Sequence, residues 1–272
     1  MTELADVHFI SGLPRSGSTL LCALLRQNPR FMTAITSPVR DLFTLLLRQM
    51  GAATEFAPFF SDDRRARILK SLMQTYHAPA PGQAVFDTAR LWTQHMALIA
   101  NLYPTARVIC CVRNIPWIID SIERMLLRNP LQTSAIFDHT TAISFETRVA
   151  ILMQPGKGLI GSALSGLREA WLGPFARKLI VIRYESLAAR PEATLNALYA
   201  ELGETQFAHS FDNLHHDEPE YDARLGMPGL HHVREQVTLE NRQSVLPPEI
   251  FNQYNGASFW QGAGNNPGVV VL

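Results

Sequence analysis

Short apolar runs alternate with longer amphipathic segments along most of this chain. The runs fall at residues 7–11, 31–36, 84–87, 107–112 and 178–184, and each has the length of a strand. Between them, apolar residues recur every three or four positions, as in helices packed on one side, in 18–27, 41–50, 62–76, 115–126 and 191–203. The run at 107–112 is apolar on both faces, which is typical of a central parallel strand. This alternation predicts an α/β protein of three layers, in which helices flank a central, mostly parallel sheet.

The pattern contains no internal repeat and no linker that would separate two domains. A length of 272 residues and a hydrophobic content of 47% are enough for one large core, so we expect a single domain over residues 1–261. Residues 262–272 are rich in glycine and asparagine, and we expect them to form a loosely ordered C-terminal tail.

The charge balance and the positions of the cysteines limit which partners and which cellular compartment we expect. Basic and acidic residues number 24 each, so no overall field attracts nucleic acid or an anionic membrane, and any anion site must be local. The N-terminus lacks the features of a signal peptide, and no stretch approaches the ~20 apolar residues of a membrane span, so we expect a cytoplasmic protein. Cys22, Cys110 and Cys111 lie in apolar stretches and are expected to be reduced core residues. The oligomeric state is not predicted.

The loop GLPRSGST, which follows the first apolar run, matches a nucleotide-binding P-loop except at one position. Gly12, Gly17 and Thr19 have the P-loop spacing, but Ser18 stands where the lysine belongs. Backbone N–H groups of such a loop, together with the N-terminus of the next helix, bind phosphate oxygens without that lysine. Arg15 adds one cation inside the loop.

A second cation, Arg113, follows the apolar run 107–112. A metal-dependent NTPase would complete its magnesium site with a carboxylate on a nearby strand, and arginine is a poor metal ligand. The sequence therefore predicts a nucleotide held by direct cationic contacts, without a metal. The cluster HHDE at 215–218 does not change this, because adjacent side chains do not converge on one ion.

These motifs resemble those of sulfotransferases that use 3′-phosphoadenosine 5′-phosphosulfate (PAPS). GLPRSGSTLL resembles their 5′-phosphosulfate loop and is closest to the tyrosylprotein type, and VRNIPWIIDSIER resembles their 3′-phosphate motif. IVIRYESL at 180–187 resembles a segment that lies near the nucleotide. The stretches at 225–237 and 247–260 resemble the closing region of a bacterial branch of these enzymes. The resemblance implies a P-loop-like fold.

The resemblance also implies a reaction and a binding site. The reaction is the metal-independent transfer of a sulfuryl group from PAPS to a hydroxyl or amine of a small molecule or peptide, which leaves adenosine 3′,5′-bisphosphate. Arg15 is expected to stabilise charge at the sulfuryl group, and the loop GLHHVR could close over the nucleotide or the acceptor. The residues implied to hold the nucleotide are Pro14, Arg15, Ser16, Gly17, Ser18, Thr19, Arg113, Ser121, Arg124, Tyr184, His231, His232 and Arg234.

Two catalytic positions depart from the family pattern. Thr88 stands where a second cation is expected, and Arg90 is the candidate that would compensate for it. The expected glutamate base is absent, which leaves Asp87, Asp41 and His77 as candidates. An acceptor that is already nucleophilic would need no base.

Two other functions stay open for these reasons. One is a protein that binds adenosine 3′,5′-bisphosphate with weak or lost transferase activity. The other, disfavoured by Ser18, is a metal-dependent small-molecule kinase. The segments at about 40–80 and 125–175, which should shape the acceptor pocket, carry no motif that identifies the acceptor.

Overall fold

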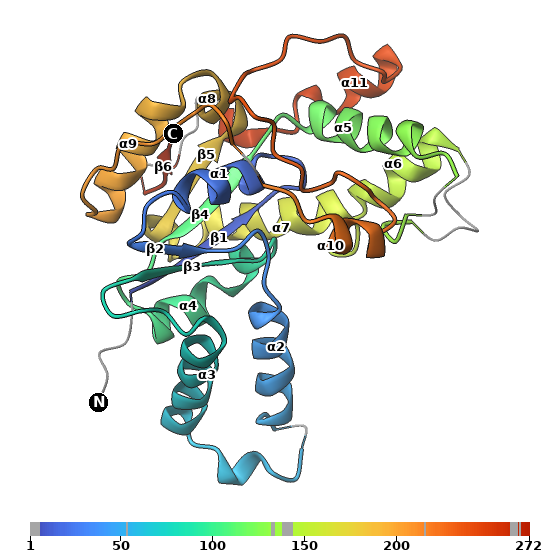
Figure 1. Cartoon of the computed structure of the whole chain (residues 1–272). Helices are drawn as coiled ribbons and strands as arrows, with labels where there is room; N and C mark the ends of the chain where they lie inside the picture. Colours follow the sequence, from blue (N-terminus) through green and yellow to red (C-terminus); the bar gives the residue numbers. More distant parts are fainter. Residues whose placement is uncertain are drawn as a thin grey trace.

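A single parallel sheet forms the centre of the molecule (Figure 1). The computed structural model describes residues 6–52, 54–131, 134–137, 144–214, 216–261, 266 and 268–272. All strand pairs in the sheet are parallel, and the strand order is β2-β3-β1-β4-β5-β6. The strands are β1 Val7–Gly12, β2 Phe31–Thr33, β3 Ala84–Thr88, β4 Val108–Val112, β5 Leu179–Arg183 and β6 Val270–Val271.

Helices cover both faces of this sheet, which confirms the predicted three layers. Alternate residues of each strand enter different cores: in β4, Val108, Cys110 and Val112 pack on one face, while Ile109 and Cys111 pack on the other. The face of Ile109 is covered by α1 Ser18–Leu25, α8 Tyr184–Ala189 and α9 Pro191–Leu202. The opposite face is covered by α2 Val39–Gln49, α3 Asp62–His77, α4 Met96–Leu102, α5 Ile115–Arg128, α6 Phe145–Met153, α7 Leu159–Leu172 and α11 Pro248–Asn255.

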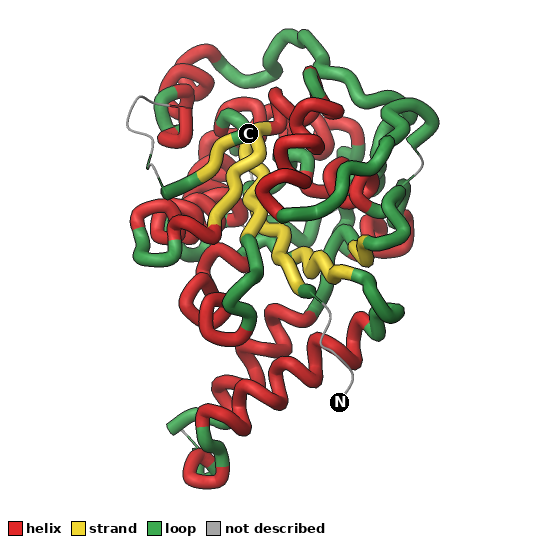
Figure 2. The backbone as a smooth tube through the Cα atoms, turned by 90° about the vertical axis from the view of Figure 1, so that its left-hand side faces the viewer, coloured by secondary structure: helices red, strands yellow, loops and turns green. Residues whose placement is uncertain are grey.

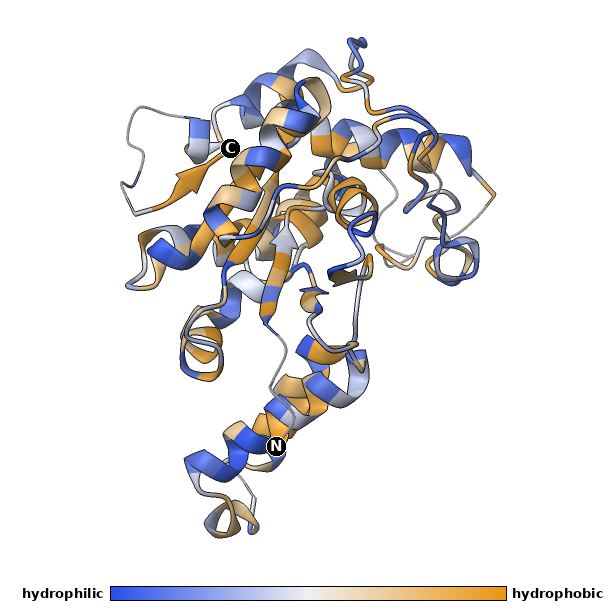
Figure 3. Ribbon diagram, turned by 60° about the vertical axis from the view of Figure 1, so that its left-hand side comes forward, coloured by the Kyte–Doolittle hydropathy of each residue, from blue (hydrophilic) through white to orange (hydrophobic). Residues whose placement is uncertain are grey.

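Two of these helices, α2 and α3, extend away from the sheet as an antiparallel pair (Figures 1 and 2). Apolar residues line their contact, as the hydropathy colouring in Figure 3 indicates. Near the far end of the pair, Phe56 and Phe59 are exposed. Most of α2 and α3 therefore lies away from the carboxyl ends of the strands.

The end of the chain corrects one prediction. Residues 262–265 and 267 lie outside the described part of the structure, but residues 268–272 are ordered against the sheet and do not form a loose tail. Val270 and Val271 pair with Ile180 and Val181, and the N–H of Leu272 donates to the carbonyl of Val181 at 2.8 Å. The apolar run GVVVL thus supplies a sixth strand that the sequence analysis missed.

The strand order creates a crevice at the carboxyl end of β1. The chain leaves β1 toward β2 and β3 on one side and returns to β4 on the other, so the connections after β1 and β4 diverge. Parallel sheets bind ligands in such a crevice, outside the carboxyl ends of the strands. The loop GLPRSGST follows β1 and Arg113 follows β4, so both candidate motifs lie at this edge.

Candidate active site

The loop after β1 has a backbone shape that depends on glycine at both ends. A Cβ on Gly12 would lie 2.5 Å from the carbonyl oxygen of Cys111, and Gly17 has a φ of 92° at the start of α1. Arg15 adopts a φ of 57°, a left-handed conformation that costs a non-glycine residue of order 1–2 kcal/mol. The Ser16 hydroxyl donates to backbone carbonyls, including that of Cys111 at 2.8 Å, so this side chain anchors the loop to β4 and faces away from the cavity.

The loop leaves the N-terminus of α1 open. Gly17 is its N-cap and provides no side chain to accept a hydrogen bond from the first turn. The first N–H groups of a helix carry a partial positive charge and need an acceptor. Ser18 and Thr19, at the start of α1, line the adjoining cavity, so this helix end can bind an anion.

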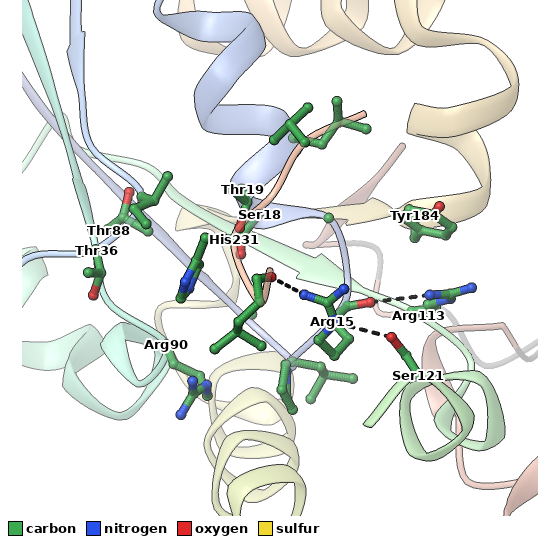
Figure 4. A pocket seen from close by; sticks show the side chains of 18 of the residues that line it. Arg15, Ser18, Thr19, Thr36, Thr88, Arg90, Arg113, Ser121, Tyr184 and His231 are labelled. Carbon is green, nitrogen blue, oxygen red and sulfur yellow. Dashed lines mark hydrogen bonds between the residues drawn. The ribbon is translucent and has the colours of Figure 1, made fainter. Parts of the chain in front are cut away.

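The two predicted phosphate motifs meet in the folded protein (Figure 4). Arg15 Nε donates to Ser121 Oγ at 3.1 Å, although 106 positions separate them in the sequence. Arg113 extends one N–H toward the Arg15 carbonyl at 3.5 Å, and its guanidinium lies 4.2 Å from the ring centroid of Tyr184. Arg113 Nε is buried without a hydrogen-bond partner in the described part of the chain. A buried N–H of this kind is a donor available to a bound anion.

Burial acts on both arginines, and the charge of a nearby arginine adds to its effect on each. Burial, together with the charge of Arg113, lowers the pKa of Arg15 to about 10, and burial also lowers the pKa of Arg113. Both stay protonated at neutral pH. Two neighbouring cations that have lost water are stabilised by an anion between them. The oxygens of a bound phosphate replace the hydrogen bonds and the charge stabilisation that water would otherwise provide.

These residues line a cavity of about 420 Å³. Its apolar part includes Leu91, Ile136 and Leu159. Although the whole chain is neutral, the lining carries an excess of positive charge, which agrees with the prediction that any anion site is local. Among the described residues, the lining includes six arginines (Arg15, Arg40, Arg90, Arg113, Arg234 and Arg242) and two carboxylates (Asp41 and Glu240).

Arg90 and Thr88 lie together on the cavity wall contributed by β3 and the residues after it (Figure 4). The Arg90 carbonyl is fixed by the Ser11 hydroxyl at 2.6 Å. Its guanidinium has no hydrogen-bond or ion-pair partner among the described residues. Loss of hydration against the surrounding protein lowers the pKa of Arg90. A free cation thus stands two residues from the position where the sequence has Thr88 instead of lysine.

The three predicted bases lie where proton abstraction from an acceptor in the cavity is less favourable than the sequence suggested. Asp87 is fully buried, accepts from Ser37 Oγ at 2.5 Å and Trp92 Nε1 at 2.7 Å, and contacts His77 Nε2 at 2.8 Å. Neither Asp87 nor His77 lines the cavity. Asp41 does line it, but its exposed carboxylate is paired with Arg40 at 2.6 Å.

Apart from Ser16, which is directed at β4, the other predicted nucleotide-binding residues lie at the cavity with one exception. Pro14, Tyr184, His232 and Arg234 line it. Arg124 does not: it extends away to Asp120 Oδ2 at 3.1 Å and to the carbonyl of Gln243. Arg124 lies one turn after Ser121 on α5, but its contacts with Asp120 and Gln243 direct its guanidinium away from the cavity.

Three functional candidates were missed by the sequence analysis. Arg242 and Glu240 line the cavity from the C-terminal segment, and Asp222, on α10 Pro219–Arg224, holds His231. No motif marks them: Arg242 and Glu240 lie in the segment from 225 to 246, which contains no helix or strand of the sheet, and Asp222 lies on a helix of only six residues. The only available signal was their position close to the stretch GLHHVR.

An open phosphate-binding loop at the crevice of a parallel sheet, surrounded by arginines, defines a nucleotide-binding protein of P-loop-like α/β fold. A family model described as "Sulfotransferase family" matches residues 8–208, so the chain belongs to the sulfotransferase family. Among the described residues, no helix is long and apolar enough to cross a membrane, and no group of three metal-ligating side chains occurs.

One curated relative also matches much of this chain. The nodulation protein NoeE of Sinorhizobium fredii (strain NBRC 101917 / NGR234) is 27% identical over 234 residues, which cover 75% of this chain and 51% of NoeE. The chain thus spans about half the length of this curated relative.

Solved structures share the fold at low sequence identity. Mouse sulfotransferase SULT7A1 complexed with PAP is 14% identical, with a TM-score of 0.54 over 97% of this chain and 86% of that chain. The sulfotransferase domain of the Synechococcus PCC 7002 olefin synthase is 15% identical, with a TM-score of 0.53 over 96% of each chain. Sulfotransferase STF9 from Mycobacterium avium is 16% identical, with a TM-score of 0.51 over 97% of this chain and 78% of that chain.

Proposed function

We propose that this protein transfers a sulfuryl group from PAPS to a hydroxyl or amine of a small-molecule or peptide acceptor. The observation that carries the proposal is the meeting of Arg15, Ser121 and Arg113 beside the open N-terminus of α1. PAPS carries two anionic groups on one ribose, a phosphosulfate at the 5′ position and a phosphate at the 3′ position. These two groups match two cationic positions at one sheet edge. The mouse structure is a complex with PAP, which is adenosine 3′,5′-bisphosphate, and this supports a nucleotide bisphosphate as the ligand class.

Residue roles follow from this arrangement. The helix start at Ser18 and Thr19 would hold the 5′-phosphate, and Arg113 with Ser121 would hold the 3′-phosphate, beside the ring of Tyr184. Arg15 and Arg90 would stabilise the charge that develops on the sulfuryl and bridging oxygens. Both carboxylates that line the cavity pair with arginines, so the donor set suits a metal-free site.

A bisphosphate-binding protein without transferase activity is the second candidate, because Thr88 occupies the position of the expected cation. Arg90 favours the enzyme, since it presents an unpaired guanidinium to the same cavity. The similarity to tyrosylprotein sulfotransferases and a cytoplasmic location stay predictions.

Calorimetric titration of the intact protein tests the nucleotide site. We expect adenosine 3′,5′-bisphosphate to bind in the presence of a metal chelator and ATP to bind far more weakly. Removing a charged hydrogen-bond donor costs about 1.5–3 kcal/mol, so Arg113→Ala should weaken binding roughly 10- to 100-fold. Arg67→Ala, an exposed cation on α3, is the matched control and should bind normally. Equal binding by the Arg113 and Arg67 variants would contradict the 3′-phosphate assignment.

Transfer of labelled sulfate from PAPS distinguishes the enzyme from the binder. Arg15→Ala should retain the fold by circular dichroism and lose transfer. Bisphosphate binding with no transfer by the wild-type protein to any acceptor, water included, would favour the binding protein instead.

A further inference from the structure

The strongest feature that the proposed function leaves unused is a histidine–carboxylate pair in the C-terminal segment. Asp222 is fully buried. One carboxylate oxygen accepts the backbone N–H of His231 at 2.9 Å, and the other lies 2.5 Å from Nδ1 of the same residue. A single carboxylate therefore fixes both the backbone and the ring of His231.

This contact determines which ring nitrogen is free. A carboxylate accepts hydrogen bonds and stabilises the proton on Nδ1, so Nε2 of the neutral ring keeps its lone pair. Nε2 makes no hydrogen bond to the described residues, and the ring, whose side chain is 16% exposed, lines the cavity. The ring is also held from one side by Tyr221, at 5.3 Å between centroids.

The ring of His231 lies in the part of the cavity where the acceptor would meet the sulfuryl group. In Figure 4 the imidazole of His231 lies between Arg15 on one side and Thr88 and Arg90 on the other, below the start of α1. The neighbouring residue, Leu230, accepts a hydrogen bond from the Arg15 guanidinium through its carbonyl, which ties this loop to the phosphate loop. The imidazole thus lies among the groups that would surround the sulfuryl group.

The other candidate bases lack this combination. Asp87 has three partners and lies outside the cavity with His77, and Asp41 is paired with Arg40. Within the described residues, His231 combines a fixed tautomer, a free ring nitrogen and access to the cavity.

We propose that His231 is the general base of the reaction and that Asp222 is its positioning residue; this inference rests on the proposed sulfotransferase function. Nε2 takes the proton from the acceptor hydroxyl while the acceptor oxygen bonds to sulfur. The bond between sulfur and the bridging oxygen breaks, and its electron pair stays on the phosphate of adenosine 3′,5′-bisphosphate. Asp222 stabilises the imidazolium, which then releases its proton to water.

A series of phenols of graded acidity, with labelled PAPS as donor, tests this role. General base catalysis contributes about 100- to 10,000-fold, so His231→Gln should lose that much rate with phenol. With 4-nitrophenol, which is largely ionised at mildly alkaline pH, the loss should be only a few-fold because no proton needs to be removed. Asp222→Asn should show the same dependence on acceptor acidity, which a purely structural defect would not produce.

Controls separate this proposal from the previous one. Glu220→Gln, on the exposed face of the same short helix, should behave as wild type. All variants should bind the bisphosphate with similar affinity, because this proposal assigns His231 to the acceptor and not, as the resemblance implied, to the nucleotide. Equal losses with phenol and 4-nitrophenol, or no loss with either, would overturn the role of His231 while leaving the transferase function intact. A wild-type protein that binds the bisphosphate but moves no sulfate to any phenol, alcohol, amine or peptide, or to water, would contradict both proposals.

Discussion

A buried histidine in β1 gives a residue-scale example of burial controlling ionisation. His8 lies in the sheet against Phe86, and its Nδ1 accepts the backbone N–H of Arg107 at 3.2 Å, which requires that this nitrogen be unprotonated. Burial lowers the pKa of His8 from 6.5 to about 4. The folded state therefore keeps a neutral ring under conditions in which the unfolded chain binds a proton.

The sign of the resulting pH dependence follows directly. Between pH 6.5 and about 4 the unfolded state binds more protons, so stability falls as the pH falls, by about 3 kcal/mol from this residue. Chemical denaturation at neutral and acidic pH should show a smaller acid loss for His8→Gln than for the wild type. His232→Gln, whose side chain is 58% exposed, is the control and should keep the wild-type acid loss. The same acid loss in the His8 variant would show that other groups cause it.

At the scale of an element, the start of α1 combines backbone strain with close packing. A Cβ on Gly17 would lie 3.0 Å from Cδ2 of Tyr184, the ring that stacks on Arg113. Gly17→Ala should lose about 1–2 kcal/mol of stability from its φ of 92° and should also displace Tyr184 and weaken bisphosphate binding.

A second glycine separates these two effects. Gly203 ends α9 with a φ of 71°, and a Cβ there would meet nothing within 4 Å. Gly203→Ala should lose similar stability in a denaturant titration and bind the bisphosphate normally. If both variants bound equally well, the contact with Tyr184 would have no role in the site.

The elements also indicate how much the sequence could predict. Buried runs such as RVICCV and IVIR carry a strand signal in the residues themselves, so five of the six strands were found. β6 was missed because its two residues belong to a short valine run that directly follows a glycine- and asparagine-rich stretch, and only the pairing with β5 shows that the run joins the sheet. Arg15 and Arg113 were found because loops at strand ends keep fixed spacing. Asp222 could not be found, because its pairing with His231 depends on how a segment without regular periodicity folds back over the sheet.

At the scale of the whole molecule, residues 225–246 cover the cavity without forming a helix or strand of the sheet, and Met227, Val233 and Leu246 are their buried apolar anchors. Polar contacts add further anchors: Asp222 binds His231, Leu230 binds Arg15, and Asp120 on α5 accepts from Arg242 at 2.5 Å and from the N–H of Val245 at 2.8 Å. Several residues of the segment, including Arg234 and Glu240, are exposed. A segment that is mostly exposed and has no regular secondary structure opens at a lower free energy than the sheet does.

Bound nucleotide should therefore order this segment in particular. The bisphosphate would bring anionic oxygens to Arg113, Arg234 and Arg242, so binding adds anchors between the segment and the core. Hydrogen exchange measured by mass spectrometry should show strong slowing in peptides from 225–246 on addition of adenosine 3′,5′-bisphosphate. Peptides from β1 and β4, which are buried in both states, should change little. Uniform slowing across the whole chain would indicate general stabilisation instead, and no change in 225–246 would show that this segment does not contact the nucleotide.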